Sequence, residues 1–334
     1  MEKVQLLLAG LSVLCVPAVY AAGLPGKNTG LISHVPVESA APLIPDDSFF
    51  PLSGEVAKAH GYDLPEPFGI NINYMNMRQN IDVDSIRFSG LGWPDYAFPS
   101  DLFDIQASHT RERSITKTVK LDAWLFPFMN IYALVGKTRG SSHSTVSVDA
   151  SPANGPIGFI IHGMNESGDL KNLDFSLRFH GTTYGAGTVL AGGYGNWYGL
   201  MDINYTRTDF NILDGHTDAF TLTPRVGYRF TTPGVDSLSL PSGKLGVWVG
   251  TMYQNVQQTF RGKLSDLSIP ASFGGLMALA DQNGNGRFEV KQHLHSPWNL
   301  LVGANYEITR NVNVTTEVGF AERNSVLVSA EYRF

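Results

Sequence analysis

Charged side chains recur at alternate positions along several extended segments of this chain. The cations nearly balance the carboxylates in this set: Lys120, Arg178, Arg225, Arg229 and Arg333 against Asp122, Asp174, Asp202, Glu307, Glu317 and Glu331. Charges that share an enclosed face must pair with each other or stay hydrated. The pattern therefore predicts either an ion-pair network that fills an interior, which is the favoured interpretation, or a narrow polar pathway for a small solute. For a pathway, the best-placed selectivity charges would be Arg225 and Arg229.

Another group of oxygen-bearing side chains lies in and after the run Asp281–Gly286. Its spacing is similar to the first half of a calcium-binding loop, whose ligands would be Asp281, Asn283, Asn285 and Glu289. Gln292 stands where such loops place a bidentate Glu, and no flanking helix is evident from the sequence. A weakly bound calcium ion is the only cofactor that the sequence suggests, and a plain Asn-Gly surface turn is the alternative.

Four histidines have neighbours that could act as nucleophiles or orienting groups in a hydrolase: His143, His162, His180 and His216. A general base must lie within hydrogen-bond reach of its nucleophile in space, and adjacency along the chain does not establish this. The chain also lacks a G-x-S-x-G elbow and an H-E-x-x-H zinc motif. No catalytic residue is assigned, and a non-enzymatic protein is favoured over a hydrolase.

The segments that would position these residues alternate apolar and polar side chains with a period of two, which is typical of β-strands. We predict ten strands, at about 68–78, 111–126, 129–139, 173–191, 197–209, 217–231, 244–259, 293–308, 312–321 and 325–334. Counting Ile81–Phe88 and Ile157–His162 as well would give twelve. So many strands of this length favour an all-β, antiparallel up-and-down transmembrane β-barrel over a soluble β-sandwich.

The final strand alternates Val326, Val328 and Ala330 with polar residues and closes on Tyr332 and Phe334. In this respect the chain resembles the outer-membrane β-barrels of Gram-negative bacteria, whose assembly machinery binds such a strand. The resemblance identifies a class and no single family. It implies location in the cell outer membrane and contact with outer-membrane lipid, lipopolysaccharide and the barrel-assembly machinery. Enzymes of this shape, such as outer-membrane phospholipases, use His with Ser or Asp near the outer rim.

The amino-terminal part divides into two regions before the barrel at residues 67–334. Residues 1–21 match a signal peptide with cleavage after Ala21, and Cys15, the only cysteine, lies inside it. Disulfides and thiolate metal sites are therefore not expected in the mature chain. Residues 22–66 are rich in proline and predict a periplasmic arm. A short helix at Ser53–His60, with Gly61 after it, would either plug the lumen or lie in a loose arm.

The lengths of the connections predict which end of the barrel faces outward. Long connections at 79–110, 140–172 and 260–292, with short ones at 210–216 and 322–324, would be outer loops, and mostly short turns would face the periplasm. Aromatic residues lie beside those turns, as an interfacial girdle requires: Phe126, Phe128, Tyr132, Tyr194, Trp197, Tyr228, Phe230, Tyr306, Tyr332 and Phe334. Trp124 falls on the face that we predict to point inward.

The net charge of −6 argues against nucleic acid as a partner, because nucleic-acid binding favours a basic surface. Three function classes remain: a porin-like transport barrel for small polar or amphipathic solutes, an envelope barrel whose outer loops bind a partner, and a lipid-modifying hydrolase. The second class rests on apolar residues in the predicted loops: Leu91, Trp93, Tyr96, Phe98, Phe273, Leu276 and Met277. The sequence leaves the oligomeric state open.

Overall fold

The computed structural model describes residues 50–59, 64–93, 96–99, 101–210, 215–233, 243–267, 271–281 and 283–334. The predicted signal peptide and most of the predicted arm lie outside these residues.

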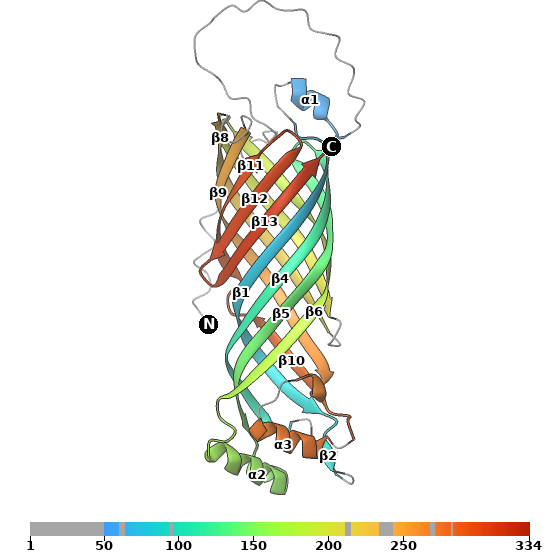
Figure 1. Cartoon of the computed structure of the whole chain (residues 1–334), viewed down its shortest axis with the longest axis vertical. Coiled ribbons are helices and arrows are strands. Elements are labelled where there is room, and N and C mark those ends of the chain that lie inside the picture. The colour runs from blue at the N-terminus through green and yellow to red at the C-terminus, as the bar shows by residue number, and fades with distance from the viewer. Residues whose placement is uncertain are drawn as a thin grey trace, which may run out of the picture.

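One antiparallel sheet rolls into a long closed barrel (Figure 1). Its strands are β1 (Phe68–Ser89), β4 (Asp104–Phe126), β5 (Met129–Asp149), β6 (Leu173–Tyr194), β7 (Trp197–Phe210), β8 (His216–Thr232), β9 (Gly243–Lys263), β10 (Arg287–Leu294), β11 (Trp298–Glu307), β12 (Val312–Phe320) and β13 (Arg323–Arg333). The sheet has 11 strands, and pairing of β1 with β4 closes it. We call the end that carries the short turns and Phe334 the proximal end, and the opposite end the distal end.

Ten of the 11 strands complete the ring at the proximal end, because β10 lies further along the barrel. The predicted strand at 293–308 is in fact two strands, β10 and β11, which both pair with β9. The β12–β13 hairpin is short, and beyond its turn β10 takes its place between β9 and β1. The class of fold and the count of about ten membrane strands are thus confirmed.

The outer wall of the proximal half is apolar. Side chains such as Ile72, Val226 and Val249 are 66%, 56% and 65% exposed, as lipid-facing residues of a barrel must be. Aromatic pairs surround the proximal rim: Phe126 stacks on Phe128 with ring centroids 5.5 Å apart, and Trp197 packs against Tyr228 at 5.2 Å. Tyr132 was wrongly assigned to this girdle, because its ring points into the lumen.

Among the described residues, no helix is long and apolar enough to cross a membrane.

The strands extend much further distally than the sequence predicts. β1 continues to Ser89, β5 continues to Asp149, and β4 already begins at Asp104. Parts of the predicted outer loops at 79–110, 140–172 and 260–292 are therefore barrel wall, and the prediction of loops was wrong for those parts. The outward face of these extensions is polar, so they lack the lipid-facing pattern by which membrane strands are recognised.

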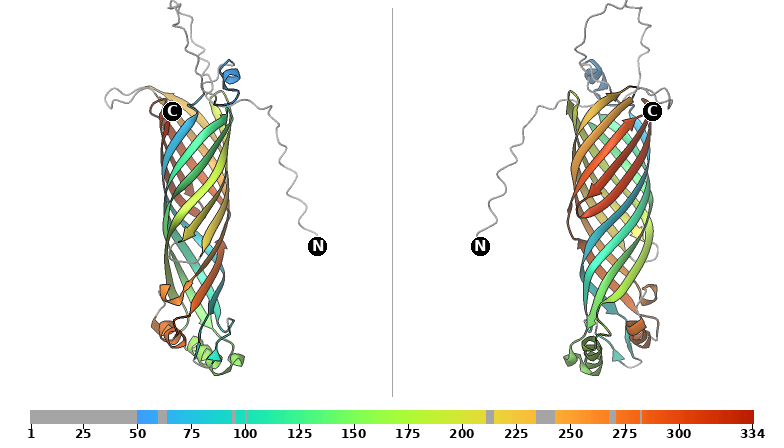
Figure 2. Two further views of the ribbon diagram at one scale, coloured as in Figure 1. Left: turned by 90° about the vertical axis from the view of Figure 1, so that its right-hand side faces the viewer. Right: turned by 60° about the vertical axis from the view of Figure 1, so that its left-hand side comes forward.

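A cap closes the distal end (Figures 1 and 2). It contains the 3-10 turn Pro152–Asn154, helices α2 (Gly155–Glu166) and α3 (Ala271–Ala280), and the small hairpin of β2 (Gly92–Trp93) and β3 (Tyr96–Ala97). Ile157–His162, one of the two doubtful strand segments, thus lies in a helix, and Pro156 at its first turn suits a helix start. Ile81–Phe88, the other segment, is the distal part of β1.

Helix α1 (Gly54–Ala59) lies at the proximal rim (Figure 1). It matches the predicted short helix, while His60 and Gly61 lie outside the described residues. Leu52 N donates to Leu125 O at 2.9 Å, and the ring of Phe50 packs against Phe68 at 5.9 Å. The described part of the arm is therefore attached to the rim.

Candidate functional site

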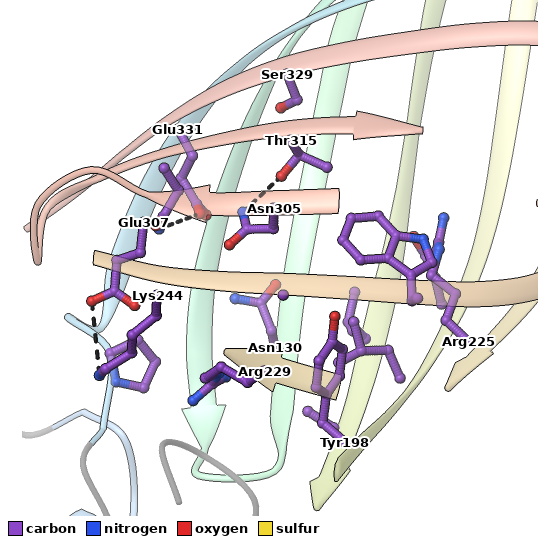
Figure 3. A pocket seen from close by; sticks show the side chains of 18 of the residues that line it. Asn130, Tyr198, Arg225, Arg229, Lys244, Asn305, Glu307, Thr315, Ser329 and Glu331 are labelled. Carbon is purple, nitrogen blue, oxygen red and sulfur yellow. Dashed lines mark hydrogen bonds and ion pairs between the residues drawn. The ribbon is translucent and has the colours of Figure 1, made fainter. Parts of the chain in front are cut away.

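The proximal half of the lumen holds a polar chamber of about 440 Å³, which we call the proximal chamber (Figure 3). Its charged lining consists of Lys120, Arg225, Arg229, Lys244, Arg310 and Arg333 with Asp122, Asp202, Glu307, Glu317 and Glu331. Nine of the 11 charges predicted to face the lumen are among these, and the signs nearly cancel as predicted. Lys244 and Arg310 were not among the predicted lumen residues, although Lys244 follows the same alternation in β9.

The prediction that Asp174 and Arg178 face the lumen was wrong. In the distal part of β6, Leu173 and Phe179 are buried in the apolar interior and Phe175 and Leu177 pack against it, so the even-numbered residues between them point outward. Asp174 and Arg178 are exposed on the outer wall. The period of two was correct. Beyond the membrane, however, the polar side chains of the strand face the water outside and the apolar side chains face the lumen.

One cluster in the proximal chamber is built around Arg333, whose side chain is 6% exposed. Its guanidinium lies 2.9 Å from Asp122 Oδ1 and 2.5 Å from Glu331 Oε1, and it covers the ring of Trp124. Asn71 and Asn130 each donate a hydrogen bond of 2.7 Å to Asp122. The cluster joins β1, β4, β5 and β13 across the closure of the barrel, and every charge in it has a partner.

A second cluster pairs Arg225 with Glu317 through two hydrogen bonds of 2.6 and 3.0 Å. Trp248 Nε1 also donates to Glu317 at 2.8 Å. Gly303 makes room for this arrangement, since a Cβ there would lie 2.4 Å from the indole of Trp248. Arg225 is thus held by a bidentate ion pair and is less suited to bind a passing solute than the sequence suggested.

Arg229 and Lys120 differ from Arg225 and Arg333, because neither has a carboxylate partner among the described residues. The guanidinium of Arg229 lies 5.9 Å from the ring centroid of Tyr198, and Lys120 Nζ lies 4.9 Å from that of Tyr132. Figure 3 shows the Arg229 side chain near Tyr198 and Lys244. Lys244 Nζ lies 3.9 Å from Glu307 Oε1. Arg229 and Lys120 are therefore the chamber cations most available to an anionic or acceptor group of a solute.

A layer of buried polar side chains separates the proximal chamber from the distal half. Glu112, only 4% exposed, accepts hydrogen bonds from Gln79 at 3.4 Å and Gln258 at 3.3 Å. Gln258 also bonds Gln292, and Arg323 Nε donates to Gln79 at 3.0 Å. We call these five residues the polar layer. It connects β1, β4, β9, β10 and β13 across the interior.

Beyond the polar layer, the lumen is filled by apolar side chains. The largest of these, Phe260, Phe273 and Phe288, are at most 2% exposed. Phe273 of α3 contacts the rings of Phe88 on β1, Phe103 just before β4, and Phe175 on β6, at centroid distances of 6.1, 6.0 and 6.4 Å. We call the cluster that includes these residues the distal core. It leaves a cavity of about 50 Å³ between the strands.

The apolar residues expected in outer loops belong mostly to the distal core. Leu91, Phe98, Phe273 and Met277 are buried there, and Leu276 packs against it. Trp93 is 46% exposed. The segments therefore fold over the barrel mouth.

The four histidines lie away from the proximal chamber. His143 Nδ1 lies 2.7 Å from Ser176 Oγ, a partner that the sequence did not indicate, and 3.7 Å separate its Nε2 from Asp174. This group lies on the outer wall with His143 60% exposed, and the last distance is too long for a hydrogen bond. His162 pairs with Asp149 and His216 with Asp218, while His180 is exposed.

The residues of the expected calcium loop follow α3 directly, contrary to the expectation of no flanking helix. Asp281 Oδ1 accepts a hydrogen bond from Gly286 N at 2.7 Å, and Asn283 and Asn285 are exposed. Glu289 lies on β10, where it pairs with Arg261 and Lys291. The described residues contain no group of three or more His, Cys, Asp and Glu side chains that could hold a metal ion. The weak calcium site stays a prediction.

No family model matches this chain, and no curated protein matches it. Solved structures are similar in fold. The β domain of the Bordetella autotransporter BrkA is 11% identical, with a TM-score of 0.36, over 80% of this chain and 100% of that one. OprG from Pseudomonas aeruginosa is 9% identical, with a TM-score of 0.31, over 81% and 98%. The toluene transporter TodX from Pseudomonas putida is 9% identical, with a TM-score of 0.29, over 81% and 90%. TM-scores this low do not support any inference about the function of this chain from these proteins.

The protein is an integral outer-membrane β-barrel. The deciding observation is its own wall, a closed antiparallel ring whose proximal outer face is apolar and whose lumen is polar. Closure satisfies the backbone hydrogen bonds within the membrane, and the apolar face requires lipid around it.

Proposed function

We propose that this barrel provides a narrow, gated pathway for small polar or amphipathic solutes and that the structure is its closed form. The observation that carries the proposal is the proximal chamber, which contains two cations without a carboxylate partner among the described residues, Arg229 and Lys120, beside the ion pairs of Arg225 and Arg333. A barrel of about ten strands leaves room for one small solute and little more.

The polar layer and the distal core supply the closed gate. A polar solute would have to displace both the polar layer and the distal core. The apolar part of an amphipathic solute, in contrast, could pack among the side chains of the distal core. The gate would open at α3, because Phe273 connects this helix to the rings of Phe88 and Phe175 on the wall and of Phe103 just before β4. Conduction of the wild type should therefore be infrequent.

The test is single-channel conductance of the refolded mature protein in a planar bilayer. Phe273→Ala should raise the open probability, and Leu279→Ala, at a 61% exposed position of the same helix, is the matched control. Arg229→Gln should shift the ion selectivity of the open steps toward cations. A silent bilayer for the wild type and for Phe273→Ala, from protein shown to be folded by heat-modifiable gel mobility, would contradict the proposal.

A second candidate is an envelope barrel that binds a partner at its distal cap. Exposed apolar side chains on the two cap helices favour it, since Phe159 and Ile160 of α2 are 69% and 50% exposed and Leu279 of α3 is 61% exposed. This hypothesis predicts no conductance in any variant. It also predicts that the partner no longer binds the distal cap when Phe159 and Ile160 are replaced by Ser. Binding unchanged by this double substitution would count against it.

A further inference from the structure

A cluster of cations lies on the outer wall just distal to the apolar belt. It spans four neighbouring strands and consists of Arg78 on β1, Arg113 and Lys117 on β4, Lys137 and Arg139 on β5, and Arg178 on β6. We call it the basic patch. All six side chains are exposed, and their strands are hydrogen-bonded in register: Arg78 lies opposite Arg113, Lys117 lies opposite Lys137, and Ser141 connects Arg113 to Arg178.

The charges of the basic patch are not neutralised by the protein. Within the described part of the chain, none of the six cations forms an ion pair, and Lys137 Nζ donates to the hydroxyl of Thr182 at 2.8 Å. Of the nearby carboxylates, Asp82 accepts from His295 at 2.9 Å, and Asp174 lies 3.7 Å from His143 and forms no ion pair with the basic patch. Like charges placed this close repel one another unless an anion lies between them.

The far side of the barrel shows that this arrangement is not a general property of the wall. There, Arg207 lies 3.2 Å from Asp209 and 3.9 Å from Asp218, and Arg261 and Lys291 pair with Glu289 at 2.5 and 3.5 Å. Arg207, Arg261 and Lys291 on the far side are thus paired with carboxylates, whereas the six cations of the basic patch form no ion pair within the described part of the chain.

The depth of the basic patch identifies what it meets. On each strand the cations follow the lipid-facing apolar residues: Tyr74 precedes Arg78, Val119 precedes Lys117, and Val135 precedes Lys137 in the distal direction. The distal end carries the longer connections and the cap, so it faces outward. The basic patch therefore lies at the headgroups of the outer leaflet.

We propose that the basic patch binds the phosphate groups of an outer-leaflet glycolipid of the lipopolysaccharide type, whose acyl chains lie along the apolar belt below. Arginine and lysine at this depth suit phosphate in geometry and charge. Ile115, which lies between Arg113 and Lys117 on the outer face and is 39% exposed, would contact the upper part of an acyl chain. The proposal is independent of whether the lumen conducts.

The experiment measures binding of the full mature barrel, refolded in detergent, to vesicles of phosphatidylcholine containing bisphosphorylated lipid A. The test variant is R113Q/K117Q/K137Q/R139Q, and the control is R207Q/R261Q/K291Q on the far side. Each basic residue near an anionic surface contributes about five-fold in affinity, so the test variant should lose at least ~10-fold. The control should lose less than ~3-fold, because its cations already have protein partners.

Folding of each variant is checked by heat-modifiable gel mobility, and R113K/R139K serves as a charge-preserving variant that should keep most of the binding. Binding should also weaken with salt. Equal loss in the test and control variants would overturn the proposal. So would equal binding to lipid A without phosphates, or competition by inorganic pyrophosphate that matches the lipid at equal phosphate concentration, since the ligand would then not be the glycolipid.

Discussion

The proximal and distal halves of the lumen are built by the same strands with opposite chemistry. In the proximal half, polar residues of β1, β5 and β9 point inward and apolar residues face lipid. In the distal half, Phe88, Val146 and Phe260 of the same strands point inward, and the outer wall is polar. The solvent outside determines which face turns inward: lipid draws the apolar face outward, and water leaves it to the interior.

The comparison also explains why the barrel is closed at one end. An apolar interior excludes water and packs densely, whereas a charged interior stays hydrated or pairs. If the two halves are independent, substitutions in one should leave the other intact.

Phe273→Ala should have the largest effect. The side chain is fully buried among three phenylalanine rings, so its removal should destabilise the distal half by about 3–5 kcal/mol. Limited proteolysis should then cut near α3, while the proximal half keeps its heat-modifiable mobility. Leu279→Ala on the same helix should behave as wild type. Loss of the whole barrel in Phe273→Ala would show that the halves are not independent.

Glu317→Gln tests the proximal half. It removes the charge that holds Arg225, which is 14% exposed, and should lower the free energy of unfolding by about 3 kcal/mol. Denaturant unfolding in micelles measures the loss. Glu307→Gln breaks the longer and more exposed pair with Lys244 and should cost less than about 1 kcal/mol. Similar losses in both variants would contradict the assignment of Arg225 and Glu317 as the buried pair.

Glu112→Leu tests the polar layer, which forms the boundary between the two halves of the lumen. It leaves the amides of Gln79 and Gln258 without their shared acceptor, at a cost of about 1–3 kcal/mol. Chemical denaturation should show this loss, whereas Gln106→Ala at an exposed position of the same strand should be neutral. Unchanged stability in Glu112→Leu would mean that the polar layer is not a structural boundary.

The smallest effect concerns the outer wall where β10 meets β1. The connection after β10 contains His295, whose pKa is raised above 6.5 by its hydrogen bond to Asp82. A raised pKa means that this pair stabilises the fold below the unfolded-state pKa and that the contribution is lost as pH rises through the folded-state pKa. An NMR titration should show the His295 pKa fall toward 6.5 in Asp82→Asn. It should stay raised in Asp84→Asn, since Asp84 contacts His293 instead.

Some site residues were predictable and others were not, for identifiable reasons. Asp122, Arg225 and Glu317 alternate with lipid-facing neighbours, so their inward direction followed from the period alone. Arg178 has the same period but lies beyond the membrane, and the sequence carries no marker of where lipid ends. The pairing of Arg225 with Glu317 joins positions 92 residues apart, which no local pattern specifies.

By itself, the sequence determined that this protein is a membrane barrel of about ten strands, because a period of two is a local property of each strand. Tertiary structure alone decided the phase of the alternation in the distal half, the burial of Phe273 under the cap, the unpaired state of Arg229 and the gathering of cations in the basic patch. Each of these depends on which strands become neighbours and on the solvent that surrounds each level of the wall. Strand register and barrel closure set both, and they involve residues far apart in the chain.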